Sequence, residues 1–218
     1  MVTNKKSNGG NDLTELLTGR GSGQSRVQFT AGQTICRQGD DADAVFYLEC
    51  GWIKISIMTP SGKEAVIGLR GNGDFFGLGG LIGRRWSDAT AFTDGSAVRI
   101  TMAALTRMLR QTPGFARAFT SYLTLQLLRD QESLVDHLTT SAEKRLARTL
   151  VRLAEIKEGD ATRVKFHINQ AMLADMVGTT RPRVNFFINK FKRLGFIDHD
   201  WPGRIRVHGG LREFLSRT

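Results

Sequence analysis

The chain has 218 residues but few of the side chains that build metal centres or disulfide-bonded domains. Its only cysteines are Cys36 and Cys50, which we expect to be buried thiols rather than redox sensors. Two thiols give neither a metal-ligand spacing nor a disulfide framework, and an iron–sulfur cluster needs about four. No histidine precedes His137, so residues 1–136 offer no axial ligand to a haem. We therefore expect no metal site and no cofactor.

Long apolar runs and catalytic groupings are missing as well. No stretch of about 18 apolar residues could cross a membrane. Lys5 and Lys6 are not followed by the hydrophobic segment of a secretory signal. No Ser-His-Asp set and no paired acid and base are visible in the sequence. We expect a cytoplasmic protein with no membrane contact, no catalytic residues and no enzymatic activity.

Positive charge, in contrast, is abundant and unevenly distributed. The whole chain has a net charge of +10. Residues 141–218 hold 16 Lys and Arg against 8 Asp and Glu, whereas residues 1–140 hold 15 against 13. A basic part joined to a nearly neutral part is typical of a nucleic-acid-binding module attached to a partner domain.

Two short helical patterns meet at Gly178 in the basic part. Apolar residues repeat at helical spacing on both sides of this glycine: Leu173, Ala174 and Val177 before it, and Val184, Phe187, Ile188, Phe191 and Leu194 after it. Gly178 suits a tight turn, Thr180 can cap the second helix, and Pro182 fits its first turn. The pattern predicts a helix-turn-helix, the alternative being an ordinary corner between two helices.

The start of the second helix is where a helix in the DNA major groove makes its base contacts. We expect Arg181 to reach a guanine edge there, with a phosphate contact as the alternative. The full set of residues predicted to bind double-stranded DNA is Gln170, Thr179, Thr180, Arg181, Pro182, Arg183, Asn185 and Lys190.

Phe186 is an unexpected residue on such a helix, since it points away from the buried face. Two interpretations are open. The phenyl ring could meet a thymine methyl group in the major groove. Alternatively, it could pack against a neighbouring helix or under a following hairpin near Trp201, which we favour because a phenyl ring gains more from burial than from one methyl group.

The first part of the chain has a different pattern. Residues 1–24 are rich in Gly, Ser, Asn and Thr and predict a flexible tail. Residues 25–112 contain short β-type runs separated by glycine turns, which predict a β-roll or barrel. In one of these runs Trp52, Lys54 and Ser56 alternate with Ile53, Ile55 and Ile57, which predicts a solvated face and a buried face.

A long helix is predicted over residues 113–139, opened by Pro113. About 26 residues span roughly 40 Å, more than a small domain needs. We therefore expect the helix to pair with its copy in a homodimer, with Tyr122, Leu123, Leu127 and Leu134 at or near the seam. Residues 140–218 form the predicted DNA-binding domain, with a further helix at 142–156 and a hairpin at 196–207 placed as the wing of a winged helix.

This order of β-roll, long helix and winged helix-turn-helix resembles the cyclic-AMP receptor protein/FNR family of bacterial transcription regulators. The resemblance covers about residues 25–215. It is carried by the helix-turn-helix and by the segments Arg37-Gln38-Gly39-Asp40, Phe46-Tyr47-Leu48, Gly71-Asn72-Gly73-Asp74-Phe75-Phe76-Gly77 and Ser141-Ala142-Glu143-Lys144-Arg145-Leu146-Ala147. It implies an α+β fold, a homodimer on a palindromic operator with recognition helices roughly 34–36 Å apart, and contact with RNA polymerase.

The residues that bind the effector in this family differ in this chain. Family members that bind cyclic AMP have a glutamate after Gly-Asp-Phe-x-Gly and an Arg-Ser pair farther on, whereas this chain has Leu78 and, in ungapped register, Asp88 and Ala89. Each lost charge-assisted hydrogen bond costs about 1.5–3 kcal/mol. Conventional cyclic-AMP sensing is therefore disfavoured.

Other possibilities remain open for these residues. A shifted site for an anionic nucleotide would use Gly77, Leu78, Gly79, Arg84, Arg85 and Arg129. A solvated basic loop at Arg84 and Arg85 is the simpler interpretation, and the protein could lack an effector and be controlled by its abundance. A non-specific architectural DNA-binding protein is the alternative to a sequence-specific regulator.

Overall fold

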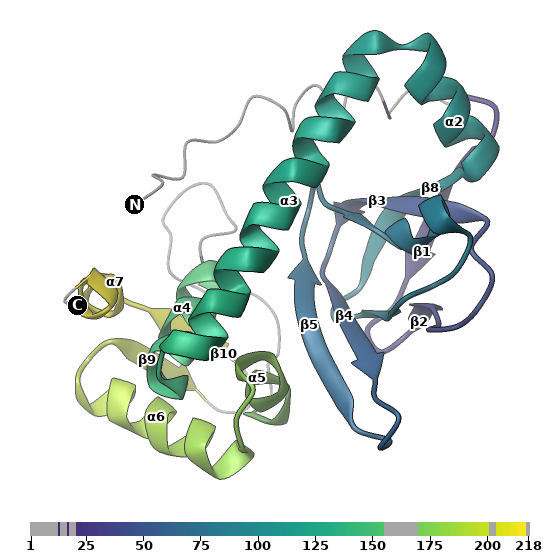
Figure 1. Ribbon diagram of the computed structural model, residues 1–218. Helices are drawn as coiled ribbons and strands as arrows, with labels where there is room; N and C mark the ends of the chain where they lie inside the picture. The colour runs from purple at the N-terminus through teal and green to yellow at the C-terminus, as the bar shows by residue number, and fades with distance from the viewer. Residues whose placement is uncertain (1–12, 14–16, 18–20, 155–169, 201–203, 217–218) are drawn as a thin grey trace. The chain divides into compact units, whose positions relative to one another are not determined.

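The computed structural model describes Leu13, Leu17 and residues 21–154, 170–200 and 204–216. The chain divides into two compact units, residues 1–130 and residues 131–218 (Figure 1). Helix α3 (Pro113–Thr139) begins in the first unit and ends in the second. The α+β class expected from the sequence is confirmed.

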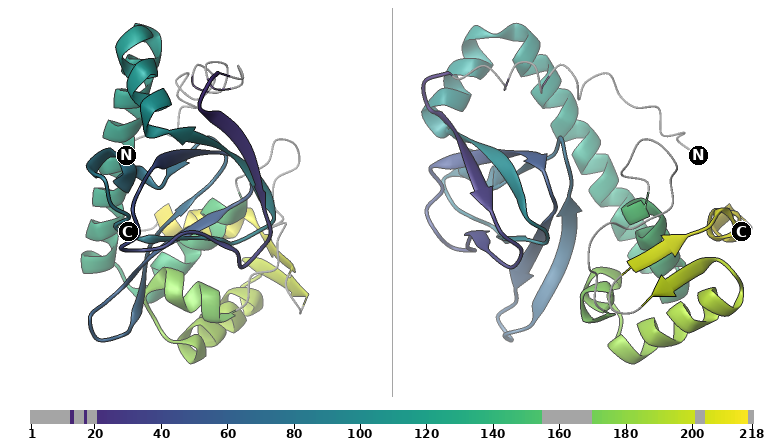
Figure 2. Two further views of the ribbon diagram at one scale, coloured as in Figure 1. Left: turned by 90° about the vertical axis from the view of Figure 1, so that its right-hand side faces the viewer. Right: turned by 180° about the vertical axis from the view of Figure 1, so that it is seen from behind.

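The first unit contains two four-stranded antiparallel sheets (Figure 2). The strand order of one sheet is β1 (Gln24–Phe29), β8 (Gly95–Thr101), β3 (Ala44–Cys50) and β6 (Phe75–Phe76). The order of the other is β2 (Thr34–Cys36), β7 (Asp88–Ala91), β4 (Ile53–Met58) and β5 (Glu64–Arg70). The short 3-10 helix η1 (Leu78–Ile82) links β6 to β7.

Strand β3 is buried on both faces because it lies between two hydrophobic cores. Phe46 and Leu48 belong to a core shared with the second sheet. Val45 and Tyr47 alternate with them and belong to the other core, which also contains Phe115 of α3. The latter core includes residues of helix α2 (Met102–Gln111), whose first turn is capped by the Thr101 hydroxyl, which accepts from Ala104 N at 3.2 Å.

The solvated face predicted for the run at β4 is wrong at two positions. Trp52 and Ser56 are both buried. Trp52 lies just before β4, and the register of β4 with β5 shifts between Ile55 and Ser56, where Ile67 is the extra residue on β5. The Trp52 indole packs against Gly71, where a Cβ would lie only 3.0 Å from the ring, so the missing side chain of Gly71 makes the room.

The flexible tail expected at residues 1–24 is also contradicted where the structure describes it. Leu13 and Leu17 are each 2% exposed and pack in the core beneath α2 and α3. Strand β1 already begins at Gln24. Of the two thiols expected to be buried, Cys36 is buried and Cys50, at the end of β3, is exposed.

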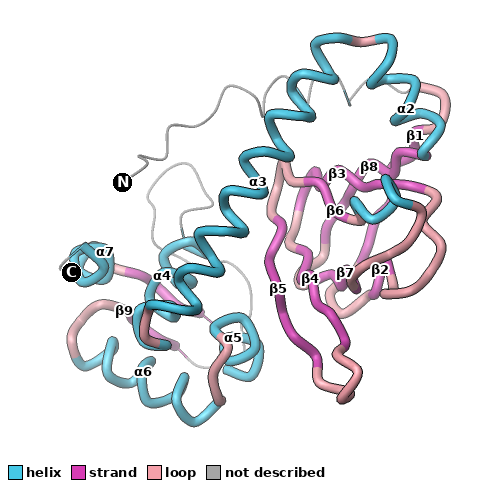
Figure 3. Tube along the Cα trace, in the orientation of Figure 1, coloured by secondary structure: helices cyan, strands magenta, loops and turns pink. Residues whose placement is uncertain are grey.

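Besides the end of α3, the second unit contains four helices and one hairpin among its described residues (Figure 3). The helices after α3 are α4 (Ala142–Ala154), α5 (Gln170–Val177), α6 (Arg181–Arg193) and α7 (Gly209–Ser216). The predicted hairpin is confirmed as the antiparallel strands β9 (Ile197–Asp200) and β10 (Arg204–Val207), although its turn lies outside the described residues. The end of the helix that was expected at residue 156 lies outside the described residues as well.

Candidate functional site

The turn between α5 and α6 is built around Gly178. Its φ of 67° is a left-handed conformation that favours glycine. Thr179 N then donates to the carbonyl of Ala174 at 3.0 Å, which closes the end of α5. Leu173, Ala174 and Val177 are buried, as their spacing predicted, and Ala174 is small enough to let α6 cross closely.

Helix α6 begins at the predicted position but is not capped as expected. Thr180 occupies the N-cap with an extended backbone, and its side chain makes no capping hydrogen bond. A cap side chain accepts from the second or third N–H of the helix, and Pro182 at the second position has none. The first turn is held instead by the backbone, since Val184 N donates to the carbonyl of Thr180 at 3.0 Å.

The two sides of α6 differ sharply in chemistry. Val184, Phe187, Ile188 and Phe191 are buried, as the sequence pattern predicted, whereas Leu194, the fifth residue of that pattern, is 51% exposed and lies just after the end of α6. The exposed side begins with Arg181, Pro182, Arg183, Asn185 and Phe186. The helix carries five Lys or Arg residues and no Asp or Glu, so its exposed side presents a positive potential.

Of the remaining predicted residues, Gln170 joins this face and Lys190 does not. Gln170 Nε2, from the start of α5, donates to Asn185 Oδ1 at 2.9 Å. Asn189 Nδ2 approaches the same oxygen at 3.4 Å. Lys190 instead forms a 2.7 Å ion pair with Glu143 of α4, so its ammonium group is held by the neighbouring helix.

Phe186 does not show the burial that we favoured from the sequence. Its side chain is 59% exposed. The ring makes an edge contact with Phe187, with ring centroids 5.6 Å apart. Trp201, the partner considered for it, lies outside the described residues.

The four residues predicted at a helix–helix seam divide into two pairs. The Tyr122 hydroxyl accepts a hydrogen bond from Phe75 N at 2.8 Å and donates one to the carbonyl of Phe75 at 3.2 Å. Burial of this hydroxyl raises its pKa. Leu123 packs against the same core. Leu127 and Leu134 are each 59% exposed. Only the second pair therefore offers a surface to another molecule.

Five of the six predicted effector residues, all except Arg129, lie close together after the end of β6. Arg85 is only 6% exposed, so the solvated loop expected at this position is wrong for Arg85, although Arg84 is exposed. Arg85 Nη1 donates to the carbonyl of Gly77 at 2.6 Å, and the guanidinium lies 5.7 Å from the centre of the Phe46 ring. Asp43 is its counter-ion at 3.8 Å and also pairs with Arg99.

Gly77 makes room for this arginine. Its backbone is left-handed, with a φ of 69°, and a Cβ there would lie 2.7 Å from Arg85 Nη1. Gly79 follows within η1. Leu78 is partly buried and packs against the apolar core, so the position where cyclic-AMP-binding relatives are expected to have a carboxylate holds a hydrocarbon side chain instead.

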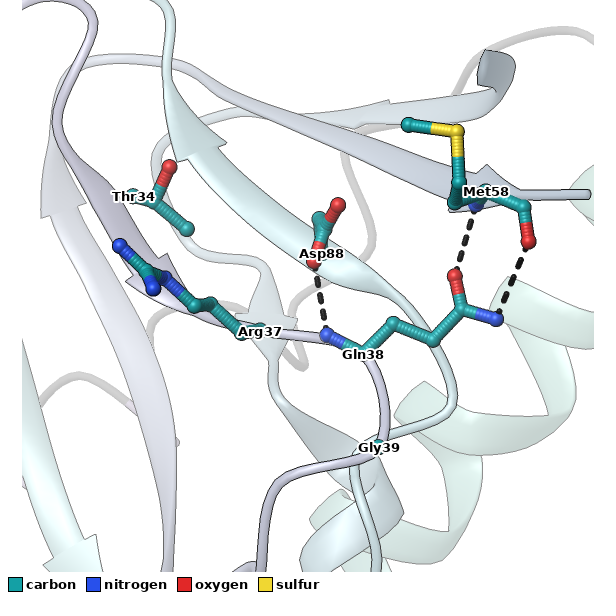
Figure 4. Close-up of a pocket in the computed structure, with 6 residues that line it drawn as sticks. All are labelled: Thr34, Arg37, Gln38, Gly39, Met58 and Asp88. Carbon is teal, nitrogen blue, oxygen red and sulfur yellow. Dashed lines mark hydrogen bonds between the residues drawn. The ribbon is translucent and has the colours of Figure 1, made fainter. Parts of the chain in front are cut away.

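The other residues compared with the cyclic-AMP pattern face elsewhere. Arg129 pairs with Asp74 at 3.6 Å. Asp88 accepts a hydrogen bond from Gln38 N at 2.7 Å on the side of a groove of about 470 Å³ (Figure 4). The Gln38 amide binds the backbone of Met58 on the far side of this groove, with Met58 N donating to it at 2.7 Å. None of the six predicted effector residues is among those that line the groove.

The described part of the chain offers neither a metal site nor a helix that could span a membrane. No group of three or more His, Cys, Asp or Glu residues there could hold a metal ion. None of the helices that the structure describes is long and apolar enough to cross a membrane.

Comparison with known proteins gives a match in each unit. Residues 26–112 match the cyclic nucleotide-binding domain, and residues 144–212 match the Crp-like helix-turn-helix domain. The CRP-like cAMP-activated global transcriptional regulator of Mycobacterium tuberculosis strain H37Rv is 30% identical over 176 residues, which cover 78% of this chain and 79% of that protein.

Solved structures show the same fold at lower identity. FixK2 from Bradyrhizobium japonicum has a TM-score of 0.75 and 18% identity, with coverage of 88% of this chain and 96% of that one. The c-di-GMP-responsive regulator CLP of Xanthomonas campestris has a TM-score of 0.72 and 19% identity, with coverage of 91% and 99%.

A cyclic-nucleotide-binding-type roll followed by a helix-turn-helix domain defines a class of DNA-binding transcription regulators. Within that class, the chain belongs to the CRP/FNR family. The members of this family are transcription regulators and not enzymes.

Proposed function

We propose that this regulator binds a specific palindromic operator as a homodimer and reads it with the exposed side of α6. The observation that carries the proposal is the division of α6 into a buried apolar side and an exposed side that is basic and polar. A major-groove helix needs such an exposed side, with residues at its N-terminal end that reach base edges. Gln170, Thr179, Thr180, Arg181, Pro182, Arg183 and Asn185 are the proposed contacts, and we drop Lys190 because Glu143 holds it.

Selection of bound duplexes from random DNA tests this proposal. A sequence-specific dimer should enrich a palindrome whose half-sites lie about one helical turn apart. It should bind that palindrome at least about 10³-fold more tightly than random duplex at physiological salt. A non-specific architectural protein would enrich no sequence and would show similar affinity for both.

The proposed dimer uses the exposed apolar stripe of α3. This stripe consists of Leu127, Leu128, Leu134, Val135 and Leu138, all of which are exposed. Contiguous exposed apolar residues mark interaction surfaces, and a long helix that pairs with its copy buries them in both chains at once. We no longer assign Tyr122 and Leu123 to this seam, because both are used within the roll.

We propose that the roll does not hold cyclic AMP in the conventional way. Leu78 supplies no carboxylate, and Asp88 is engaged by Gln38. Titration of the full chain with cyclic AMP should give neither binding heat nor a rise in melting temperature. A rise that grows with ligand concentration would overturn this proposal.

The buried Arg85 favours a second candidate, a site for a different anionic nucleotide. A guanidinium that is 6% exposed, with a carboxylate at 3.8 Å as counter-ion, could exchange that partner for a phosphate. A ligand of this kind should raise the melting temperature of the wild-type chain and leave that of Arg85→Met unchanged. Cyclic GMP and cyclic di-GMP are the first compounds to test, the latter because CLP responds to it.

We further propose contact with RNA polymerase, as the family resemblance implies, and action in the cytoplasm, where a bacterial regulator meets its DNA. In-vitro transcription from a promoter that carries the selected operator tests the first point. Transcription that is unchanged by the protein at every operator position would contradict it.

A further inference from the structure

Phe186 is the one large apolar side chain on the exposed side of α6. Its helical neighbours at three and four residues' distance are Pro182, Arg183, Asn189 and Lys190, and the first three of these are exposed. A single exposed apolar residue is ordinary on a protein surface. Here, however, the ring stands among the polar and basic residues that we propose as the reading surface.

The ring is also held in place. It rests edge-on against the buried Phe187, with an interplanar angle of 69° and ring centroids 5.6 Å apart. A phenyl ring has only two side-chain torsions, so little freedom is lost when it meets a partner. The geometry therefore presents a rigid apolar group outward from a fixed helix.

The charge around the ring indicates what it meets. Helix α6 has five basic residues and no acidic ones, a composition that favours the phosphate-rich surface of DNA over an apolar protein face. Within the major groove, the apolar group that base pairs present is the C5-methyl group of thymine. An A·T base pair is therefore the partner that suits an apolar ring in this position.

We propose that Phe186 is a specificity-determining residue that selects thymine by its methyl group. This inference rests on the proposed function, since it requires α6 to lie in the major groove. It adds a contact without a hydrogen bond to the polar contacts of Arg181 and its neighbours.

The test uses the selected operator, in which each thymine is replaced in turn by deoxyuridine, a change that removes only the methyl group. Affinity is measured by fluorescence anisotropy. At one position in each half-site, the wild-type chain should bind about fourfold more weakly, the equivalent of about 0.8 kcal/mol for one buried methyl group. Replacement in both half-sites should weaken binding by about 16-fold, since separate positions are roughly additive.

The variant Phe186→Ala changes both half-site contacts of the dimer, so it should bind the thymine operator about 16-fold more weakly than the wild type. It should also no longer distinguish thymine from deoxyuridine. Leu194→Ala is the matched control, because Leu194 is also an exposed apolar residue but follows the last residue of α6, at the end far from Arg181. This variant should keep the wild-type sensitivity to deoxyuridine.

Two results would overturn the inference. Equal wild-type affinity for every deoxyuridine duplex would exclude methyl recognition, and this measurement does not depend on the folding of any variant. Equal weakening of Phe186→Ala on operator and random duplex would identify a backbone contact. Both results leave sequence-specific binding in place, whereas failure to enrich any sequence in the selection would contradict the proposed function itself.

Discussion

Arg145 of α4 donates its Nε to the carbonyl of Val177, the last residue of α5, at 2.9 Å. The Nη1 of the same guanidinium donates to the carbonyl of Thr140, just after the end of α3, at 2.6 Å. The last carbonyls of a helix have no partner within that helix. One arginine therefore satisfies carbonyl groups at the ends of two helices. It joins the end of α5, the first helix of the helix-turn-helix, to the end of α3.

Replacement of Arg145 should destabilise the second unit. Hydrogen bonds to a charged group contribute about 1.5–3 kcal/mol, and Arg145→Ala leaves both carbonyls without their donor. Urea unfolding followed by circular dichroism measures the loss. Arg148→Ala is the control, because Arg148 makes an exposed ion pair with Asp136 that should contribute less than about 1 kcal/mol. An equal loss in both variants would contradict the role given to Arg145.

Arg181→Ala should change base preference as well as affinity. A guanidinium that binds the guanine edge bidentately discriminates by about 1–3 kcal/mol. The variant should therefore lose its preference at one base pair in each half-site, measured on operators with single base-pair changes. Arg193→Ala, at the other end of α6, should weaken all duplexes alike. The same uniform weakening by Arg181→Ala would mean that Arg181 binds a phosphate.

The double variant Leu127→Glu with Leu134→Glu should be monomeric. Both side chains are exposed, so the charges need not disturb either core, but they would be desolvated in a paired helix. Sedimentation velocity should show the loss of the dimer together with the loss of operator binding. Met58→Glu, a change at an exposed apolar residue of the roll, should leave the dimer intact. A double variant that sediments as a dimer would refute the seam on α3.

Stability should fall at alkaline pH because of Cys36. Burial raises the pKa of this thiol to about 11, although Arg85 partly opposes the effect. Below the ordinary value of 9.0, folded and unfolded chains both carry the neutral thiol. Between about 9 and 11 the unfolded chain loses the proton while the folded chain keeps it, so the free energy of unfolding decreases as pH rises.

The measurement is the pH slope of urea unfolding in the wild type and in Cys36→Ala. The variant has no thiol to titrate, so its slope should be flatter, by about 2 kcal/mol in total between pH 9 and pH 11. Its absolute stability also changes because a cavity is formed, and for that reason the slopes are compared. Parallel slopes would show that Cys36 is not responsible.

The helix-turn-helix could be predicted because its determinants are local. The spacing of Val184, Phe187 and Phe191 fixes the buried side of α6, and Gly178 fixes the turn, so no distant residue is needed. The same reasoning placed Thr180 correctly at the N-cap but was wrong about its side chain, which makes no capping hydrogen bond although Arg183, at the third helical position, still has an N–H.

The predictions that failed depend on contacts between distant parts of the chain. Arg85 is buried because it packs against the Phe46 ring and donates to the carbonyl of Gly77. The residues next to Arg85 in the sequence do not predict these two contacts. Leu13 stands in a polar, glycine-rich segment, so the composition around it predicted a flexible tail. In the structure it packs in a core with residues of α2 and α3. Short pieces such as β2 and β6 have too few residues to show an alternating pattern.

The division of α6 into two sides also affects how this regulator can evolve. Folding is secured by Val184, Phe187, Ile188 and Phe191, while the exposed residues of the helix carry little of the folding free energy. Mutations at Arg181, Arg183 or Phe186 can therefore accumulate without loss of the folded chain. Duplicated copies of the gene could acquire new target sequences one substitution at a time while their scaffold stays the same.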